Sequence, residues 1–221
     1  MEVIDLSHPV EKGMSIHHTQ PEVIIKPWSF HSGSDRPSSL LLQMSEHTGT
    51  HVDALSHMSE DVSLPSIDQM ELKSFMGKAL CIDLSNNDPG ALISKEEVSN
   101  SLSNAPGHDE MFDFLFLYTD HFRRYYHSDQ WFNGPGLSIE AAQWICELPI
   151  NAFGVETMSP GVSGISNRQV HRICGSTGVT HYENLRNLHL LIGRGIFQFI
   201  GLPINIKGGT GSPVRAVAVF S

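Results

Sequence analysis

A run of histidines and one aspartate between residues 46 and 57 carries the residue types of a catalytic metal site. It places His47, His51, Asp53 and His57 at odd-numbered positions. Side chains two residues apart in a strand share a face, so all four could point into one cavity. A helix would also align His47 with His51, but the intervening Thr-Gly-Thr segment is a poor helix former. The run is therefore predicted to be a strand that leads into a loop.

The chemistry of this run follows from its donor atoms. Two imidazoles and a carboxylate are the nitrogen and oxygen ligands that zinc, manganese or iron prefers. Burying them without a metal would be costly, because each loses its hydration. His57 is then left over for proton transfer. Its alternative role is that of a hydrogen-bond partner that orients a metal ligand.

Length and composition indicate one folded domain spanning residues 1–221. Of the 221 residues, 40% are hydrophobic and 17% are charged, as in a globular protein rather than a disordered one. The formal net charge of −10 argues against nucleic-acid binding, because no excess of Lys or Arg is available to neutralise phosphates. No apolar stretch approaches the roughly 20 residues that span a bilayer, so no membrane association is expected.

The N-terminal segment and the cysteines predict a cytoplasmic protein. The first residues lack a basic segment followed by an apolar one, so no signal peptide is expected. Cys81, Cys146 and Cys174 are odd in number, widely separated and form no CxxC pair. Free, mostly buried thiols in a reducing compartment fit this pattern.

The elements that must position the site are a mixture of strands and helices. Serine caps predict three helices, which begin after Ser94, Ser138 and Ser166. The third carries His171, and Gln169 completes a capping box with its serine. Strands are expected at residues 3–6, 23–25, 39–44, 78–84, 114–118, 151–155, 196–200, 204–206 and 214–220. Since strands and helices do not alternate strictly, an α/β fold with a mixed, largely antiparallel sheet is predicted.

Several segments of the chain match a known family in the same order. The signature His-x-Gly-Thr-His-x-Asp-x-x-x-His, from residue 47 to residue 57, resembles the metal-dependent cyclase family that includes bacterial kynurenine formamidase and isatin hydrolase. The other matching segments are residues 5–9 with 13–14, 135–138 with 140–142, 183–188, and 211–216. The resemblance therefore covers nearly the whole chain.

The resemblance implies a set of metal ligands. His47, His51 and Asp53 would bind one divalent metal. Asp53 would bridge to a second metal, which His171 and Glu183 would hold; these two residues are 12 positions apart. We expect zinc, with manganese as the alternative, and one or two ions per chain. Both metals suit mixed imidazole and carboxylate ligands.

The same resemblance implies the catalytic group, the fold and the assembly. His57 matches the catalytic histidine of the family. Members adopt an α/β fold of the swivelling β/β/α type and commonly assemble as dimers or tetramers. A single domain of this fold, associated as a homodimer or homotetramer, is therefore expected.

The chain departs from the family pattern where substrate would be contacted. His17 and His18 stand where many members have an aromatic residue followed by Pro-Gly, and His121 lies in another altered segment. These three histidines are candidate substrate contacts, or else solvated loop residues. His181 would share a face with Glu183 only if that segment is extended, so it is not expected to bind metal. Cys174 is not expected to bind metal either, because the family pattern gives no support for it.

These observations predict a metal-dependent hydrolase that acts on a C–N bond of a small substrate. An arylformamide such as N-formylkynurenine, or a lactam such as isatin, would be attacked by metal-activated water. A lactone or cyclic-ester hydrolase, or a cyclase or dehydratase, could use the same residues. A metal-binding homologue without catalysis is an alternative of another class, although His57 and all expected ligands are present. An interaction domain without metal would leave the histidine run unexplained.

Overall fold

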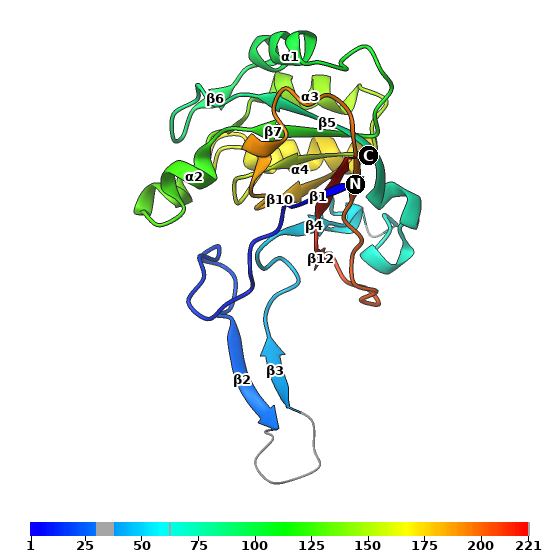
Figure 1. The fold of residues 1–221 in the computed structure, drawn as a ribbon. Helices are drawn as coiled ribbons and strands as arrows, with labels where there is room; N and C mark the ends of the chain where they lie inside the picture. The colour runs from blue at the N-terminus through cyan, green and yellow to red at the C-terminus, as the bar shows by residue number, and fades with distance from the viewer. Residues whose placement is uncertain (30–37, 62, 221) are drawn as a thin grey trace.

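A nine-stranded sheet forms the centre of the computed structural model, which describes residues 1–29, 38–61 and 63–220 (Figure 1). Its strand order is β1-β13-β11-β5-β7-β9-β10-β4-β12. The bounds of these strands are β1 Glu2–Asp5, β4 His51–Asp53, β5 Met76–Asp83, β7 Phe114–Tyr118, β9 Ala152–Val155, β10 Thr180–Glu183, β11 Phe197–Ile200, β12 Gly211–Pro213 and β13 Val217–Phe220.

The sheet is parallel in the middle and antiparallel on both sides. β5, β7, β9 and β10 run parallel to their neighbours within this group. Antiparallel pairs join β1, β13, β11 and β5 on one side, and β10, β4 and β12 on the other. The predicted α/β fold with a mixed sheet, in which antiparallel pairs predominate, is confirmed. The predicted strand at residues 204–206 is wrong, because Ile206 donates its backbone N–H to the Ile204 carbonyl in a turn.

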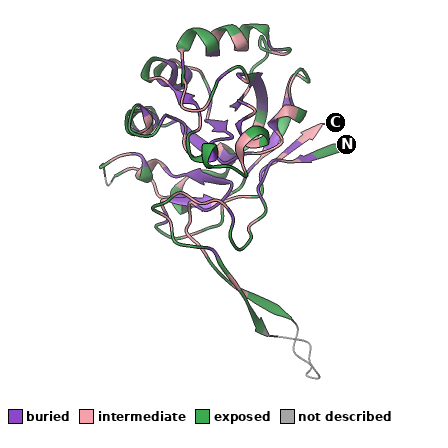
Figure 2. Ribbon diagram, turned by 90° about the vertical axis from the view of Figure 1, so that its left-hand side faces the viewer, coloured by how far each residue is buried: buried purple, intermediate pink, exposed green. Residues whose placement is uncertain are grey.

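Helices cover one face of the sheet (Figure 1). Side chains of α1, α3 and α4 pack there against alternate residues of the central strands, such as Leu115 and Leu117 of β7. Phe114 and Phe116 belong to a second core on the opposite face, which is covered by loops and short helices. Figure 2 shows buried residues concentrated between these layers. The helices are α1 Lys95–Asn104, α2 His121–Tyr125, α3 Ile139–Cys146 and α4 Asn167–Thr177, with 3₁₀ helices at Leu55–His57, Ile67–Gln69, Leu72–Phe75, Asp129–Phe132 and Leu188–Leu190.

Two of the three predicted helix caps form as expected. Ser94 and Glu97 make a reciprocal capping box, and the Ser138 hydroxyl accepts the Ala141 N–H. Ser166 does not cap α4 with its side chain. Its hydroxyl instead donates to the Leu137 carbonyl and accepts the backbone N–H of Val162, so this serine joins the preceding loop to the segment that contains Leu137.

A two-stranded hairpin projects from the body of the protein (Figures 1 and 2). It consists of β2 Ile24–Ser29 and β3 Ser39–Gln43, which among the described strands pair only with each other. Trp28, Leu40 and Leu42 of this hairpin are 73%, 66% and 51% exposed. A second short pair, β6 Leu92–Ile93 with β8 Gly136–Leu137, links the segments that precede α1 and α3. None of the helices in the described part of the chain has the length and apolarity to cross a membrane.

Glu156 is a fully buried carboxyl at the end of β9. Oε2 accepts hydrogen bonds from the backbone N–H and the hydroxyl of Thr119, whereas Oε1 has no partner among the described residues. Burial, together with the charge of Asp120, raises the pKa of Glu156 to about 7.

Glu156→Gln is predicted to raise the free energy of unfolding more at pH 8 than at pH 5. The folded state holds the Glu156 proton more tightly than the unfolded state, so its contribution to stability is lost as pH rises from about 4.5 to about 7. The neutral amide avoids this loss, which reaches about 3 kcal/mol at most. Urea unfolding at both pH values tests this, with the exposed Glu147→Gln as the control. An equal effect of Glu156→Gln at both pH values would contradict the prediction.

Candidate metal centre

The histidine run folds differently from the predicted strand, yet it brings its side chains together. Only His51–Asp53 is a strand, β4, and His47 lies in a preceding turn. Gly49 has a φ of +65°, in the left-handed region that favours glycine. The turn carries His47 back over the strand, where its Nδ1 lies 2.9 Å from Asp53 Oδ1. The prediction that strand alternation aligns all four residues is therefore wrong for His47, which reaches the site through a turn, and for His57, which lies in the 3₁₀ helix Leu55–His57.

Two neighbouring strands supply the floor of the site. His51 and Asp53 lie on one face of β4, and His181 and Glu183 lie on one face of β10. The strands are antiparallel, with Glu183 directly opposite His51. The His51 Nε2 consequently lies 3.4 Å from Asp53 Oδ1 and 3.3 Å from Glu183 Oε2.

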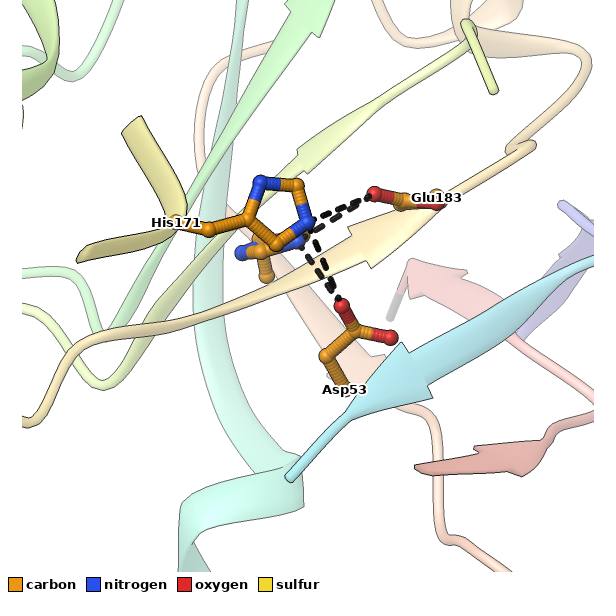
Figure 3. A group of neighbouring side chains, drawn as sticks. Asp53, His171 and Glu183 are labelled. Atoms are coloured by element: carbon orange, nitrogen blue, oxygen red, sulfur yellow. Dashed lines mark ion pairs between the residues drawn. The ribbon is translucent and has the colours of Figure 1, made fainter. Parts of the chain in front are cut away.

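His171 enters the site from the helical layer. Figure 3 shows its ring, from α4, directed toward Asp53 and Glu183, which come from different strands. Its Nε2 is 3.7 Å from Asp53 Oδ2 and 3.8 Å from Glu183 Oε1. Its Nδ1 is 2.9 Å from the Asn167 carbonyl, to which it can donate. The Nε2 lone pair then faces the two carboxylates.

His51 is oriented in the same way as His171. Its Nδ1 lies 2.8 Å from the carbonyl of Gly49, which again directs Nε2 toward the carboxylates. In metalloproteins a histidine ligand usually donates its other ring N–H to a carbonyl or carboxylate, which fixes the ring. Both histidines have this arrangement.

His181, which the sequence analysis did not expect to bind metal, is a member of the cluster. It is fully buried, and its Nε2 lies 3.2 Å from both Asp53 Oδ2 and Glu183 Oε1. Neither contact has hydrogen-bond geometry, so this nitrogen lacks a hydrogen-bond partner in the described structure. The available signal was its position two residues before Glu183, which places both on one face once the segment is extended.

The outermost strand closes the site beside His47. A Cβ on Gly211 of β12 would lie 2.6 Å from His47 Cε1. The neighbouring Thr210 hydroxyl is 3.0 Å from His47 Nε2 and donates to Glu46. The His47 ring therefore occupies space that any side chain at residue 211 would fill.

Two buried carboxylates dominate the electrostatics of this cluster. Burial would raise the pKa of Asp53, but the imidazoles of His181, His47 and His51 hold it well below its usual range. Glu183 shows the same balance: burial and the charge of Asp53 oppose its ionisation, yet its imidazole neighbours lower its pKa to about 2. Both carboxylates are therefore ionised at neutral pH.

The imidazoles respond to the same charges in the opposite direction. Burial alone would lower the pKa of His51 and His181, but Asp53 and Glu183 raise it to about 10 and about 9 respectively. In the protein without metal, these two protons balance the two buried anions. A divalent cation would displace them, since only a neutral imidazole can coordinate.

The donor atoms fit divalent metal ions. His47, His51 and Asp53 form one group, whereas Asp53, His171, His181 and Glu183 form another; within each group the candidate ligand atoms lie within 4.8 Å of one another. Asp53 belongs to both groups. Imidazole nitrogens with carboxylate oxygens suit zinc or manganese, and the orphaned His181 nitrogen supplies a further donor.

A cavity of about 180 Å³ opens onto the cluster, and its walls include Asp53, His171 and Glu183. His57, at the end of the 3₁₀ helix that follows β4, also lines it. Its Nε2 is 3.8 Å from Asp53 Oδ2, and 38% of its side chain is exposed. Burial lowers the pKa of His57, so its imidazole is mainly neutral at pH 7.

Comparison with known proteins identifies the family. The family model described as putative cyclase matches residues 4–162. The chain belongs to the cyclase family. A kynurenine formamidase from Salinibacter ruber is 26% identical over 220 residues, covering 98% of this chain and 97% of that protein. The kynurenine formamidase of Bacillus mycoides is 30% identical over 179 residues, covering 80% and 77%.

Solved structures share the fold of this cyclase-family chain. Isatin hydrolase A from Labrenzia aggregata, bound to benzyl benzoate, has a TM-score of 0.83 at 24% identity, covering 98% of this chain and 93% of its own. An isatin hydrolase bound to the product analogue thioisatinate has a TM-score of 0.85 at 21% identity, covering 99% and 92%. The α/β fold implied by the resemblance is confirmed.

The cyclase-family fold places the three candidate substrate histidines in different environments. His17 lines the metal-site cavity and an adjoining cavity of about 90 Å³, whereas His18 lines only the adjoining one. His121 is fully buried; its ring stacks on Trp131, and its Nε2 is 3.1 Å from the Trp131 carbonyl. The described walls of both cavities do not include His121, which packs against Trp131 of the adjoining cavity.

Proposed function

We propose that this chain is a metal-dependent hydrolase that cleaves the C–N bond of a small amide-type substrate, an arylformamide or a lactam. The observation that carries the proposal is the position of Asp53, whose carboxylate belongs to both groups of candidate ligands at the base of a cavity. The names of the related proteins, kynurenine formamidase and isatin hydrolase, support the same class of reaction.

In this proposal His47, His51 and Asp53 hold one divalent ion, and Asp53, His171 and Glu183 hold a second. His181 is a further candidate ligand of the second ion, since its Nε2 lies 3.2 Å from both Asp53 Oδ2 and Glu183 Oε1. Zinc is the expected metal and manganese the alternative. A bound ion supplies Lewis acidity and lowers the pKa of a coordinated water.

His57 is the proposed proton carrier. Its neutral imidazole lines the cavity and can accept a proton from the attacking water. It can then return that proton to the leaving nitrogen as the C–N bond breaks.

The cavities favour a small aromatic substrate. The adjoining cavity shares His17 and Asn167 with the metal-site cavity, and Trp131 and Phe132 form part of its wall. An aryl ring can pack against these side chains while the attached carbonyl group faces the metal cluster. Hydrolysis of a lactone, or a cyclase or dehydratase reaction, would use the same residues.

We further propose that the hairpin β2–β3 binds a second copy of the chain, in a dimer or tetramer. An isolated two-stranded hairpin is marginally stable in water, and this one exposes Trp28, Leu40 and Leu42. Covering these side chains would stabilise both partners.

The free, buried Cys81, Cys146 and Cys174 support the expectation of a cytoplasmic protein.

Chelation of the metal is predicted to abolish hydrolysis of N-formylkynurenine or isatin, and added zinc or manganese to restore it. Asp53→Asn should lose both metal and activity, because it removes the charge shared by the two ligand groups. Elemental analysis and a spectrophotometric assay measure these effects, with circular dichroism to verify folding. Exposed Asp61→Asn is the matched control. Full activity in metal-free protein would refute the proposed function, whereas turnover of a matched lactone alone would favour the ester alternative.

His57→Ala is predicted to retain its metal while its kcat falls roughly 10²- to 10⁴-fold, the usual contribution of a positioned proton carrier. Steady-state kinetics and elemental analysis of the same sample separate these effects. His127→Ala, which alters an exposed histidine, should behave as wild type. A near-normal rate would exclude His57 from proton transfer, and loss of metal would make it a ligand.

The double variant Trp28→Glu, Leu40→Glu is predicted to convert the oligomer to monomers, because it places charges in the apolar surface that the second copy would cover. Light scattering coupled to size-exclusion chromatography measures the mass. Met111→Glu, at a position 89% exposed and outside the hairpin, is the control. An unchanged oligomer in the double variant, or a monomeric wild type, would argue against this interface.

A further inference from the structure

A larger cavity, of about 710 Å³, lies beside the proposed active site. It shares His57, Asn167 and His171 with the metal-site cavity, so the two meet at these side chains. A substrate whose carbonyl group faces the metal cluster can therefore extend past His57 into this second space. The chemistry of its walls then decides which substituents are accepted.

Two arginines of α4 form one wall of the larger cavity. Arg168 and Arg172 are four residues apart and therefore lie on the same side of the helix. Arg168 and the cluster residue His171 are three apart, a spacing that puts their Cβ atoms about 5–6 Å from each other. Both arginines line the same cavity as His57 and the cluster residue His171.

The loop after His57 places one carboxylate between these arginines. Glu60 Oε1 lies 3.9 Å from Arg168 Nη2 and 3.7 Å from Arg172 Nη2. The three side chains are 91%, 77% and 58% exposed, in the order Glu60, Arg168, Arg172. Exposed ion pairs of this length contribute little to stability, so Glu60 is easily displaced. The contact nevertheless shows that one carboxylate oxygen can lie near both guanidinium groups.

The charge at this wall contrasts with that of the whole chain. The protein has 24 acidic residues against 14 lysines and arginines. Here two arginines face the cavity with a single carboxylate between them. The first turn of α4, which contains Arg168, adds the partial positive charge of a helix N-terminus. The cavity wall is therefore locally cationic in an acidic protein.

We propose that Arg168 and Arg172 bind a carboxylate of the substrate, which replaces Glu60 between them, while the scissile carbonyl group faces the metal cluster. The proposal rests on the hydrolase function proposed above and narrows its substrate class to amide-type compounds that carry a carboxylate several bonds from the cleaved C–N bond. N-formylkynurenine carries such a group, whereas isatin does not. Guanidinium and carboxylate groups match in charge and geometry, which makes this pairing selective.

A matched pair of substrates tests the proposal on the metal-loaded enzyme. The substrates are 4-(2-formamidophenyl)-4-oxobutanoate and its terminal carboxamide, which differ only in charge at the distal end. Wild-type kcat/KM should be about 10-fold higher for the carboxylate, mainly through KM, and the preference should shrink as salt screens the exposed arginines. The double variant Arg168→Gln, Arg172→Gln should abolish the preference. Arg194→Gln, which removes an exposed arginine paired with Glu2, should retain both the preference and the rate.

Glu60→Gln provides a test in the opposite direction. Removal of the competing carboxylate should lower KM for the charged substrate about 2- to 5-fold relative to the carboxamide, since an exposed ion pair of this kind is weak. A merely structural role of Glu60 would change KM for both substrates alike. Equal kcat/KM values for the two substrates in wild type, or a preference that survives in the double arginine variant, would overturn the proposal.

Binding of the deformylated products keeps this test separate from the proposed activity. Isothermal titration should show tighter binding of 4-(2-aminophenyl)-4-oxobutanoate than of its carboxamide, and the double arginine variant should lose the difference. If this preference is found without hydrolysis, the hydrolase proposal fails and the carboxylate site stands. If hydrolysis occurs without any preference in binding, only the carboxylate site fails.

Discussion

Asp53 and Glu183 are two ionised carboxylates buried side by side, and the cost of burying them governs the whole site. Each anion loses its hydration and repels the other, so the protein must supply positive charge close to both. Imidazoles from a turn, two strands and a helix surround them. Without metal the imidazole protons compensate the anions, and a divalent ion can replace them. The same arrangement thus balances the charge of the two anions and supplies donor atoms for a divalent ion.

The sheet meets this requirement where its parallel part becomes antiparallel. β10 is the last parallel strand, and β4 runs against it with Glu183 opposite His51. Side chains of both strands that point toward the helical layer consequently converge, and α4 adds His171 above them. The cluster lies on a base of strands, whereas its cavities are largely bounded by loops and by α4. Such a division allows substrate preference to change while the metal ligands remain fixed.

Much of this arrangement could be predicted from the sequence, because residue chemistry and local periodicity are visible there. The mixed sheet and the caps at Ser94 and Ser138 agree with the structure. The residues expected to bind metal lie close together in it. The roles of other residues could not be predicted, because they depend on contacts with distant parts of the chain. Ser166 hydrogen-bonds a distant carbonyl rather than capping α4. His181 was not expected to be a ligand, because its face is defined only once β10 has paired with its neighbours.

Gly211 has a consequence for how this protein can change. The edge of a sheet is ordinarily a permissive place for substitution, because one side of it faces solvent. Here the edge strand β12 lies against His47, and even a methyl group at residue 211 would occupy the space of that ring. Mutational libraries aimed at new activities should therefore hold this periphery constant and diversify the loops instead. In this molecule, the loops around the cavities can vary more freely than the edge strand β12 that lies against His47.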